Sequence, residues 1–227
     1  NLELCKTPFQ SDFEAESMGF SAHDNLPKNF SDYFIALVSE KIAQKTELDI
    51  WSGVEGDGSF DGFATLLATD VNLPADQKLT GTTIDASNVI DELGSVVDAL
   101  PKSIYGSDDL FLYVSQNVWR AYKRSLGGFG TQGQGANGVN GQGNNQDINI
   151  QYFDGIKVVC ANGLAKDTMI ATTKTNLFFG TGLLNDHNEV KVLDMAQTLG
   201  DKNVRFIMRY TACVQYSIVE DICTYGI

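Results

Sequence analysis

The sequence predicts an α+β fold, and three observations point to this class. In residues 204–219 every even-numbered position is apolar or aromatic and five of the odd-numbered positions are polar, the pattern of one very long β-strand. Residues 31–51 carry apolar side chains at the i, i+4 spacing of a long amphipathic helix. Helical and strand-like segments alternate between these two stretches. We therefore expect an elongated mixed architecture, because an ordinary strand has only about five or six residues.

The long helix is the first large element. It is expected to begin after Pro27, because the residue before a proline is pushed out of helical space. Asn29 or Ser31 can cap its first turn. Its apolar row consists of Phe30, Phe34, Val38 and Ile42. The helix leads into residues 53–62, where Gly and Asp dominate and predict a turn-rich loop.

The middle of the chain predicts a compact unit of helices and strands. An apolar stripe at helical spacing indicates a helix over 88–100, which Pro101 ends. Asp154-Gly155 is a strong hairpin turn signal between two strands. A short helical turn is expected at 63–67, a further helix at 115–126, and strands at 110–114, 148–152, 156–160, 169–173 and 190–194.

Residues 127–147 have low complexity. Gly, Asn and Gln dominate, and no charged residue occurs before Asp147. Such a tract cannot bury enough apolar surface to offset its ordering entropy, so a flexible loop is predicted. Residues 128–133 spell G-x-G-x-x-G, but the segment follows a helix and leads into more loop. A dinucleotide site requires the opposite context, a preceding strand and a following helix.

The long strand over 204–219 closes the chain. Its even-numbered positions are apolar or aromatic throughout. Because successive side chains of a strand point to opposite faces, this segment is predicted to have one apolar and one more polar face. The polar side chains are Arg205, Arg209, Thr211, Gln215 and Ser217.

Composition argues against several kinds of site. The formal net charge is -13, which disfavours non-specific binding of nucleic acid by the bulk of the chain. The four cysteines form no C-x-x-C pair, and the two histidines, His23 and His187, lie far apart, so no zinc site is expected. The loop over 53–62 fails the calcium pattern, since Phe60 stands where that pattern needs Gly. No apolar run is long enough for a transmembrane helix.

No catalytic, cofactor-binding or metal-binding residue is therefore assigned, and the chain is not expected to be an enzyme. One alternative is a soluble hydrolase that uses dispersed carboxylates, with Asp57, Asp61 and Asp154 as candidates. A pocket in which three or more acids converge would support that alternative.

Several segments occur in an order that resembles a known family. They are Trp51-Ser52-Gly53, residues 58–63, 110–114, 153–159 and 176–181, and the final run Arg205 to Tyr210. Together with the long helix, they resemble the major capsid proteins of tailed bacteriophages, whose fold is shared by encapsulin shell proteins. The resemblance rests on element order over nearly the whole chain rather than on one diagnostic motif.

The resemblance implies a fold with two domains. Residues 1–75 and 188–227 would form an elongated peripheral domain that contains the long helix and the long strand. Residues 76–187 would form an axial domain, a central β-sheet flanked by helices, with the flexible loop over 127–147.

The resemblance also implies a function. The protein would be the major capsid protein of a tailed phage or prophage, with copies of itself as its main partners. Hexamers and pentamers would build an icosahedral head that encloses DNA without sequence-specific binding. Scaffold, portal and decoration proteins are further expected partners, and a membrane is not. The expected location is the virion capsid, and the host cytoplasm during assembly. An encapsulin-type nanocompartment shell is the alternative.

The chain also departs from the family pattern. The family has an N-terminal arm and a full extended loop before the long helix. Here we expect only the last strand of that loop, near Leu2 to Cys5. Because the chain opens on Asn1 rather than Met, upstream sequence is expected to have been removed.

Overall fold

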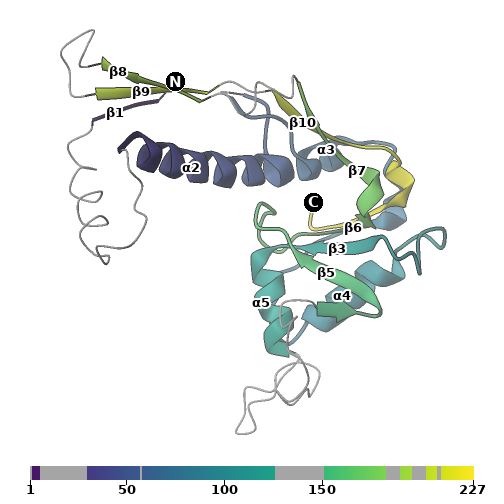
Figure 1. Cartoon of the computed structure of the whole chain (residues 1–227). Coiled ribbons are helices and arrows are strands. Elements are labelled where there is room, and N and C mark those ends of the chain that lie inside the picture. The colour runs from purple at the N-terminus through teal and green to yellow at the C-terminus, as the bar shows by residue number, and fades with distance from the viewer. Residues whose placement is uncertain are drawn as a thin grey trace, which may run out of the picture. The chain divides into compact units, whose positions relative to one another are not determined.

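The structure is a computed structural model that describes residues 2–5, 30–56, 58–125, 151–182, 190–195, 203–208 and 211–227 (Figure 1). The chain forms two compact units. Unit 1 comprises Asn1–Thr46 and Thr181–Ala212, and unit 2 comprises Glu47–Gly180 and Cys213–Ile227. The boundaries of these units differ from those of the predicted peripheral domain (1–75 and 188–227) and axial domain (76–187). The division into a peripheral and an axial domain therefore stays a prediction. The predicted loop over 127–147 lies outside the described residues.

Unit 1 contains a three-stranded antiparallel sheet. Its strands are β1 (Leu2–Cys5), β9 (Asn203–Met208) and β8 (Val190–Asp194), in the order β1-β9-β8. The strands predicted near 2–5 and at 190–194 are thus confirmed. Arg205 of β9 lies opposite Glu3 of β1, and its guanidinium contacts that carboxylate at 2.9 Å. This ion pair holds the pKa of Glu3 below its ordinary value.

The long helix is confirmed as α2 (Phe30–Ser52). Its residues as far as Thr46 belong to unit 1, and its last turns belong to unit 2. None of the helices in the described ranges is long and apolar enough to cross a membrane.

The predicted single strand over 204–219 is wrong. The structure has two strands in this region, β9 and β10 (Ala212–Tyr216), and Thr211 between them is not in a strand. Residues 209 and 210 lie outside the described ranges. β9 pairs with β1 and β8, whereas β10 pairs with β7 (Leu177–Thr181). A strand continues only while its backbone finds partners, and these two segments find theirs in different sheets.

Unit 2 is built on a six-stranded mixed sheet. In spatial order its strands are β2 (Lys78–Leu79), β11 (Ile222–Tyr225), β6 (Met169–Thr173), β3 (Leu110–Val114), β5 (Ile156–Cys160) and β4 (Gln151–Phe153). β3, β5 and β6 have the predicted bounds. β4 and β5 form the predicted hairpin, in which Asp154 has φ +50° and Gly155 φ +81°. β11 was not predicted as a strand, yet it pairs with β6 inside this sheet.

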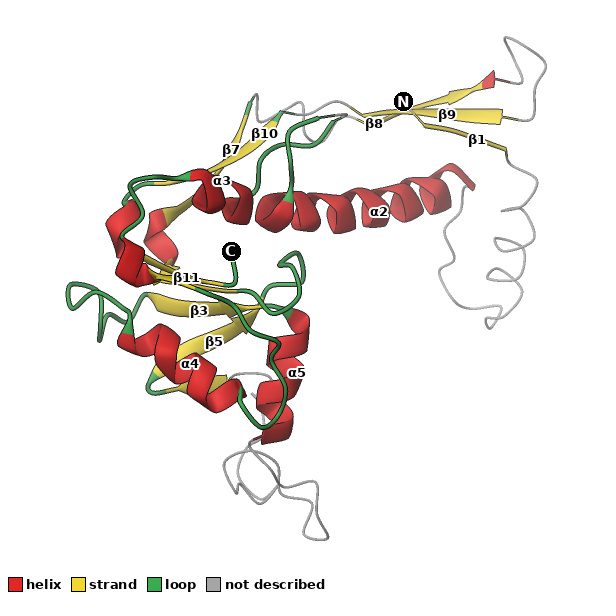
Figure 2. Ribbon diagram, turned by 180° about the vertical axis from the view of Figure 1, so that it is seen from behind, coloured by secondary structure: helices red, strands yellow, loops and turns green. Residues whose placement is uncertain are grey.

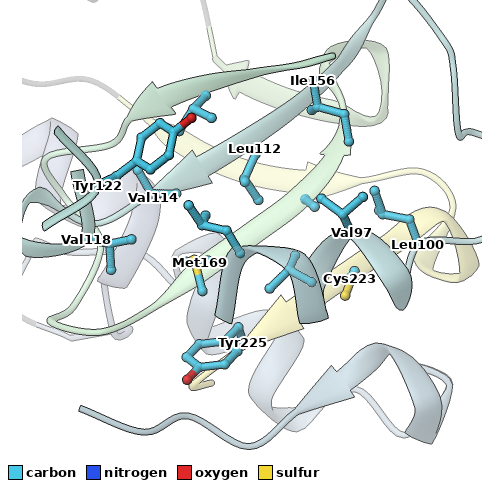
Figure 3. Packing of buried hydrophobic residues seen from close by; sticks show 14 of the residues in the cluster. Val97, Leu100, Leu112, Val114, Val118, Tyr122, Ile156, Met169, Cys223 and Tyr225 are labelled. Atoms are coloured by element: carbon cyan, nitrogen blue, oxygen red, sulfur yellow. The ribbon is translucent and has the colours of Figure 1, made fainter. Parts of the chain in front are cut away.

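Two hydrophobic cores lie on opposite faces of the central sheet. On one face, α4 (Val89–Asp98) and α5 (Gln116–Ser125) cover Leu112 and Val114 of β3 and Met169 of β6 (Figures 2 and 3). On the other face, the end of α2 and α3 (Phe63–Thr69) bury Ile170 and Ile222. Successive residues of each strand alternate between the two faces, so each face contributes apolar side chains to one of the cores.

Candidate interaction surfaces

Two of the three candidate carboxylates, Asp61 and Asp154, lie in the described ranges, and the structure places them in separate loops. Asp61 lies in the loop after α2, where its Oδ1 accepts a hydrogen bond from the Glu55 backbone N–H at 2.8 Å. Asp154 lies in the turn between β4 and β5. Asp57, His23 and His187 lie outside the described residues. Among the residues that the structure describes, no three His, Cys, Asp or Glu side chains gather as a metal site.

A cavity of about 680 Å³ in unit 2 also lacks converging acids. It is lined by residues 78–83, 166–167 and 226–227, together with Ala75. Its single carboxylate, Asp167, accepts hydrogen bonds from the Ile84 backbone N–H at 3.1 Å and from the Asn117 side-chain amide. The Asp167 carboxylate therefore joins its own loop to the loop at Ile84 and to the first turn of α5. The observation that would have supported a hydrolase is not found in this cavity.

Exposed apolar side chains mark one surface, the ribbon of β7 and β10. Backbone hydrogen bonds at its two ends join Asn176 with Ser217 and Gly182 with Thr211, so the strands are antiparallel. On β7, the Phe178 side chain is 53% exposed and the Phe179 side chain is 48% exposed. Successive residues of a strand point to opposite faces, so one aromatic ring is exposed on each face of this narrow ribbon. Single exposed apolar residues are ordinary, but exposed aromatic rings on both faces of a two-stranded ribbon make it a candidate contact surface.

A second uncovered surface lies on the central sheet near its β4 edge. Phe111, Lys157 and Tyr152 lie side by side on β3, β5 and β4, as the strand registers show. The Lys157 ammonium lies 5.5 Å from the Phe111 ring centre, and Tyr152 is 59% exposed. α3 and the end of α2 pack over the β6 and β11 side of this same face, where Ile170 is fully buried.

A basic surface is formed by the outward side of α5. Val118, Ala121 and Tyr122 are buried, so Arg120 and Arg124 point outward and are exposed. Lys123 Nζ lies 4.9 Å from the ring centre of the partly exposed Trp119. We call Arg120, Lys123 and Arg124 the basic face.

Two charges of the basic face reach the end of β5. Burial raises the pKa of the Cys160 thiol there, and the nearby positive charges of Arg120 and Lys123 oppose part of that rise. No acidic residue occurs between Asp109 and Asp147, so α5 and the segments on either side of it contribute no carboxylate to the basic face.

An acidic surface lies on α4, which packs beside α5 over the same sheet face (Figure 3). Val89, Leu93, Val96 and Val97 are buried, so Asp91 and Asp98 point outward and are exposed. We call these two residues the acidic face. Glu92, by contrast, is engaged inside the unit, where its carboxylate accepts hydrogen bonds from Tyr225 at 2.8 Å and Thr82 at 3.0 Å.

Comparison with known proteins identifies the fold. No protein-family model and no curated protein sequence matches the chain. Solved structures do match. The capsid of an empty GTA particle has a TM-score of 0.60 at 11% identity, over 99% of this chain and 70% of that chain. The satellite phage P4 procapsid including the size determination (Sid) protein has a TM-score of 0.53 at 9% identity, over 99% and 72%. Mycobacterium phage Che8 has a TM-score of 0.50 at 13% identity, over 87% and 63%.

The chain therefore has the mixed α+β fold of phage major capsid proteins, as the segment order in the sequence indicated. It spans between 63% and 72% of the length of these three matched chains. At such low identities the likeness defines the fold alone.

Sequence reasoning missed the surfaces described above. None of them contains a catalytic or metal-binding motif, and the charged faces depend on which helices become neighbours in the fold. A signal was present, because residues 85–109 contain six acidic residues and one lysine, whereas residues 110–146 contain three basic residues and no acidic one.

Proposed function

We propose that this chain is a shell subunit, the major capsid protein of a tailed bacteriophage or prophage. Copies of it would assemble into the hexamers and pentamers of an icosahedral head that encloses DNA. The observation that carries this proposal is that the likeness to the GTA capsid and P4 procapsid chains extends over 99% of the present chain. A likeness confined to one sheet would have been compatible with many functions, since fold alone does not define function.

The surface of unit 2 is consistent with this role. A subunit that works by meeting its copies needs contact surfaces, and the β7–β10 ribbon and the uncovered part of the central sheet expose aromatic side chains. It needs no catalytic cluster. The acidic composition suits a shell lining that does not bind packaged DNA tightly, because a net charge of -13 repels phosphate groups.

Within this proposal, the two domain names can be assigned. We assign the peripheral domain to unit 1, with most of α2 and the β1-β9-β8 sheet. The axial domain would be unit 2, with the six-stranded sheet and helices α4 and α5. Scaffold, portal and decoration proteins are the further partners that such a subunit would meet.

Electron microscopy of the full-length gene product tests the proposal. We expect closed icosahedral particles or free capsomers, and DNA inside particles from the native source. Persistent monomers at high protein concentration would contradict the proposal. Particles that hold a cargo enzyme instead of DNA would point to an encapsulin-type compartment.

A further inference from the structure

We infer that the basic face of α5 docks onto the acidic face of α4 of a second copy of this chain. The inference rests on the proposed function, because it names the surfaces through which two shell subunits would meet. It starts from two neighbouring helices of opposite charge that lie over the same face of one sheet.

Two arginines of the basic face and both aspartates of the acidic face have no charged or hydrogen-bonding partner within the part of the chain that the structure describes. These residues are Arg120, Arg124, Asp91 and Asp98. All four residues are exposed. The other acidic side chain of α4, Glu92, is already held by Tyr225 and Thr82 and is excluded from the docking surface.

The two helices also agree in length. α4 and α5 each have ten residues, so each is about 15 Å long. Asp91 and Asp98 are separated by about 10 Å along α4, and Arg120 and Arg124 by about 6 Å along α5. The long arginine side chains can span this difference, so two contacts of opposite charge can form together.

Apolar side chains lie beside the charges. Ile90, next to Asp91, is 45% exposed, and the partly exposed Trp119 lies next to Arg120. Exposed ion pairs contribute little when taken singly, so the charges select which surfaces meet and in which register. Apolar contacts of Ile90 and Trp119 would contribute the desolvation that a stable contact needs.

A second copy accounts for both faces, whereas nucleic acid accounts for only one. A phosphate backbone would be attracted to Arg120, Lys123 and Arg124 but repelled by Asp91 and Asp98 on the adjacent helix. The net charge of -13 adds to that repulsion at long range. A copy of the chain brings an acidic face for the basic one and a basic face for the acidic one. The contact can therefore form reciprocally in a pair or head-to-tail in a ring.

Reversal of each face tests the inference. We compare the unaltered full-length chain with two double variants, Arg120→Glu with Arg124→Glu, and Asp91→Lys with Asp98→Lys. Self-association is measured by sedimentation velocity at about 0.1 M and about 1 M salt. Interactions between exposed charges are screened beyond roughly 10 Å at the lower salt concentration and beyond roughly 3 Å at the higher one. We expect each variant alone to associate at least about tenfold more weakly than the unaltered chain, because like charges then face each other.

The decisive sample is an equimolar mixture of the two double variants. We expect it to regain the association of the unaltered chain, because the two reversed faces complement each other. The matched control is Lys166→Glu with Lys174→Glu, which changes the net charge as much as the α5 variant does, at exposed sites outside both helices. This control should associate normally, and far-UV circular dichroism should show that all variants are folded.

Several outcomes would overturn the inference. One is normal association of either double variant, and another is a mixture no better than its components. A third is loss of binding to a DNA duplex by the α5 variant while its association stays normal, which would assign the basic face to nucleic acid. If the variants still form shells in electron micrographs, the inference fails and the proposed function stands. If the unaltered chain never associates, both fail.

Discussion

Asn176 uses all the hydrogen-bonding capacity of its side-chain amide. The side chain is buried, and its Nδ2 donates to Thr172 Oγ1 at 3.1 Å and to the Ile218 carbonyl at 2.7 Å. Its Oδ1 accepts from the backbone N–H groups of Ser217 and Ile218 at 3.0 Å and 2.8 Å. These contacts satisfy the backbone just where β10 ends, so one side chain stops the strand that the sequence predicted to continue.

The variant Asn176→Asp tests the hydrogen bonds that the side-chain amide donates separately from those that it accepts. It keeps the acceptor and removes the donor, so the Ile218 carbonyl loses its partner and faces a buried carboxylate. We expect the free energy of unfolding to fall by about 1 to 3 kcal/mol. Urea melts of the purified chain measure this change. The exposed neighbour Thr175→Ala is the control and should be nearly neutral; an equally small effect of Asn176→Asp would contradict the role of the amide.

Cys223 makes stability sensitive to alkaline pH. It is fully buried in the central sheet, and burial raises the pKa of its thiol from 9.0 to about 12. The unfolded thiol therefore loses its proton at a lower pH than the folded one does. Ionisation favours the unfolded state in this window, so the contribution of Cys223 is present below pH 9 and is lost as the pH rises toward 12.

We expect the free energy of unfolding to decline from about pH 9 to pH 10, before tyrosines begin to contribute. Cys223→Ala should flatten this decline, although it lowers stability at neutral pH by leaving a small cavity. Cys213→Ala is the control, because Cys213 is exposed, and it should leave the pH dependence unchanged. Denaturant melts at a series of pH values measure all three slopes; identical slopes would refute the role of Cys223.

The end of α2 is the element on which the second core of unit 2 is built. Trp51 packs at 5.0 Å from the Tyr113 ring and 5.6 Å from the Phe63 ring, measured between ring centres. The neighbouring Ser52 Oγ donates to the Gly163 carbonyl at 2.7 Å. A Cβ atom at Gly163 would lie 2.2 Å from the Glu47 carbonyl oxygen. The helix can therefore approach this loop only because residue 163 has no side chain.

We predict that Gly163→Ala lowers the free energy of unfolding by about 1 to 3 kcal/mol, because backbone must shift to relieve the overlap. Gly94→Ala, in α4, is the matched control. A Cβ there meets nothing within 4 Å, and alanine favours the helix by about 0.5 to 1 kcal/mol. Thermal melts should thus move in opposite directions for the two variants. A Gly163→Ala protein as stable as the unaltered chain would show that the close approach is unimportant.

At the scale of the whole molecule, the tract at 127–147 is predicted to be dispensable for folding. Its composition lacks the apolar side chains that build a core, and shortening a flexible loop changes closure entropy by only about 0.6 kcal/mol per halving. Deletion of residues 130–145 should therefore shift the melting temperature by less than about 2 °C. Differential scanning calorimetry measures this shift, and a large drop would mean that the tract contributes contacts.

Much of the fold was predictable because most elements carry their own periodicity. The stripe of Val89, Leu93 and Val97 defines α4 whatever it packs against. The bounds of β3, β5 and β6 follow equally from short apolar runs between turn signals. β11 was missed because Ile222–Tyr225 is short and has no clear alternation, and it is a strand only because β6 and β2 lie on either side of it.

The candidate surfaces were less predictable, since each combines residues from separate segments. Lys157 and Tyr152 become neighbours of Phe111 only through the register of three strands. The acidic and basic faces depend, in addition, on which side of each helix is buried. Without knowing that Val118 and Tyr122 point inward, the outward direction of Arg120 could not be distinguished from that of its neighbours.

The sequence by itself determined the fold class, the position of most helices and strands, and the resemblance in element order to capsid proteins. Local periodicity and turn chemistry suffice for these, because they act between residues close in the chain. Only the tertiary structure decided that residues 204–219 divide between two sheets, that Ile222–Tyr225 joins the central sheet, and that an acidic helix lies beside a basic one. These outcomes depend on which backbone and side-chain groups find partners far along the chain, and a local sequence pattern does not specify those partners.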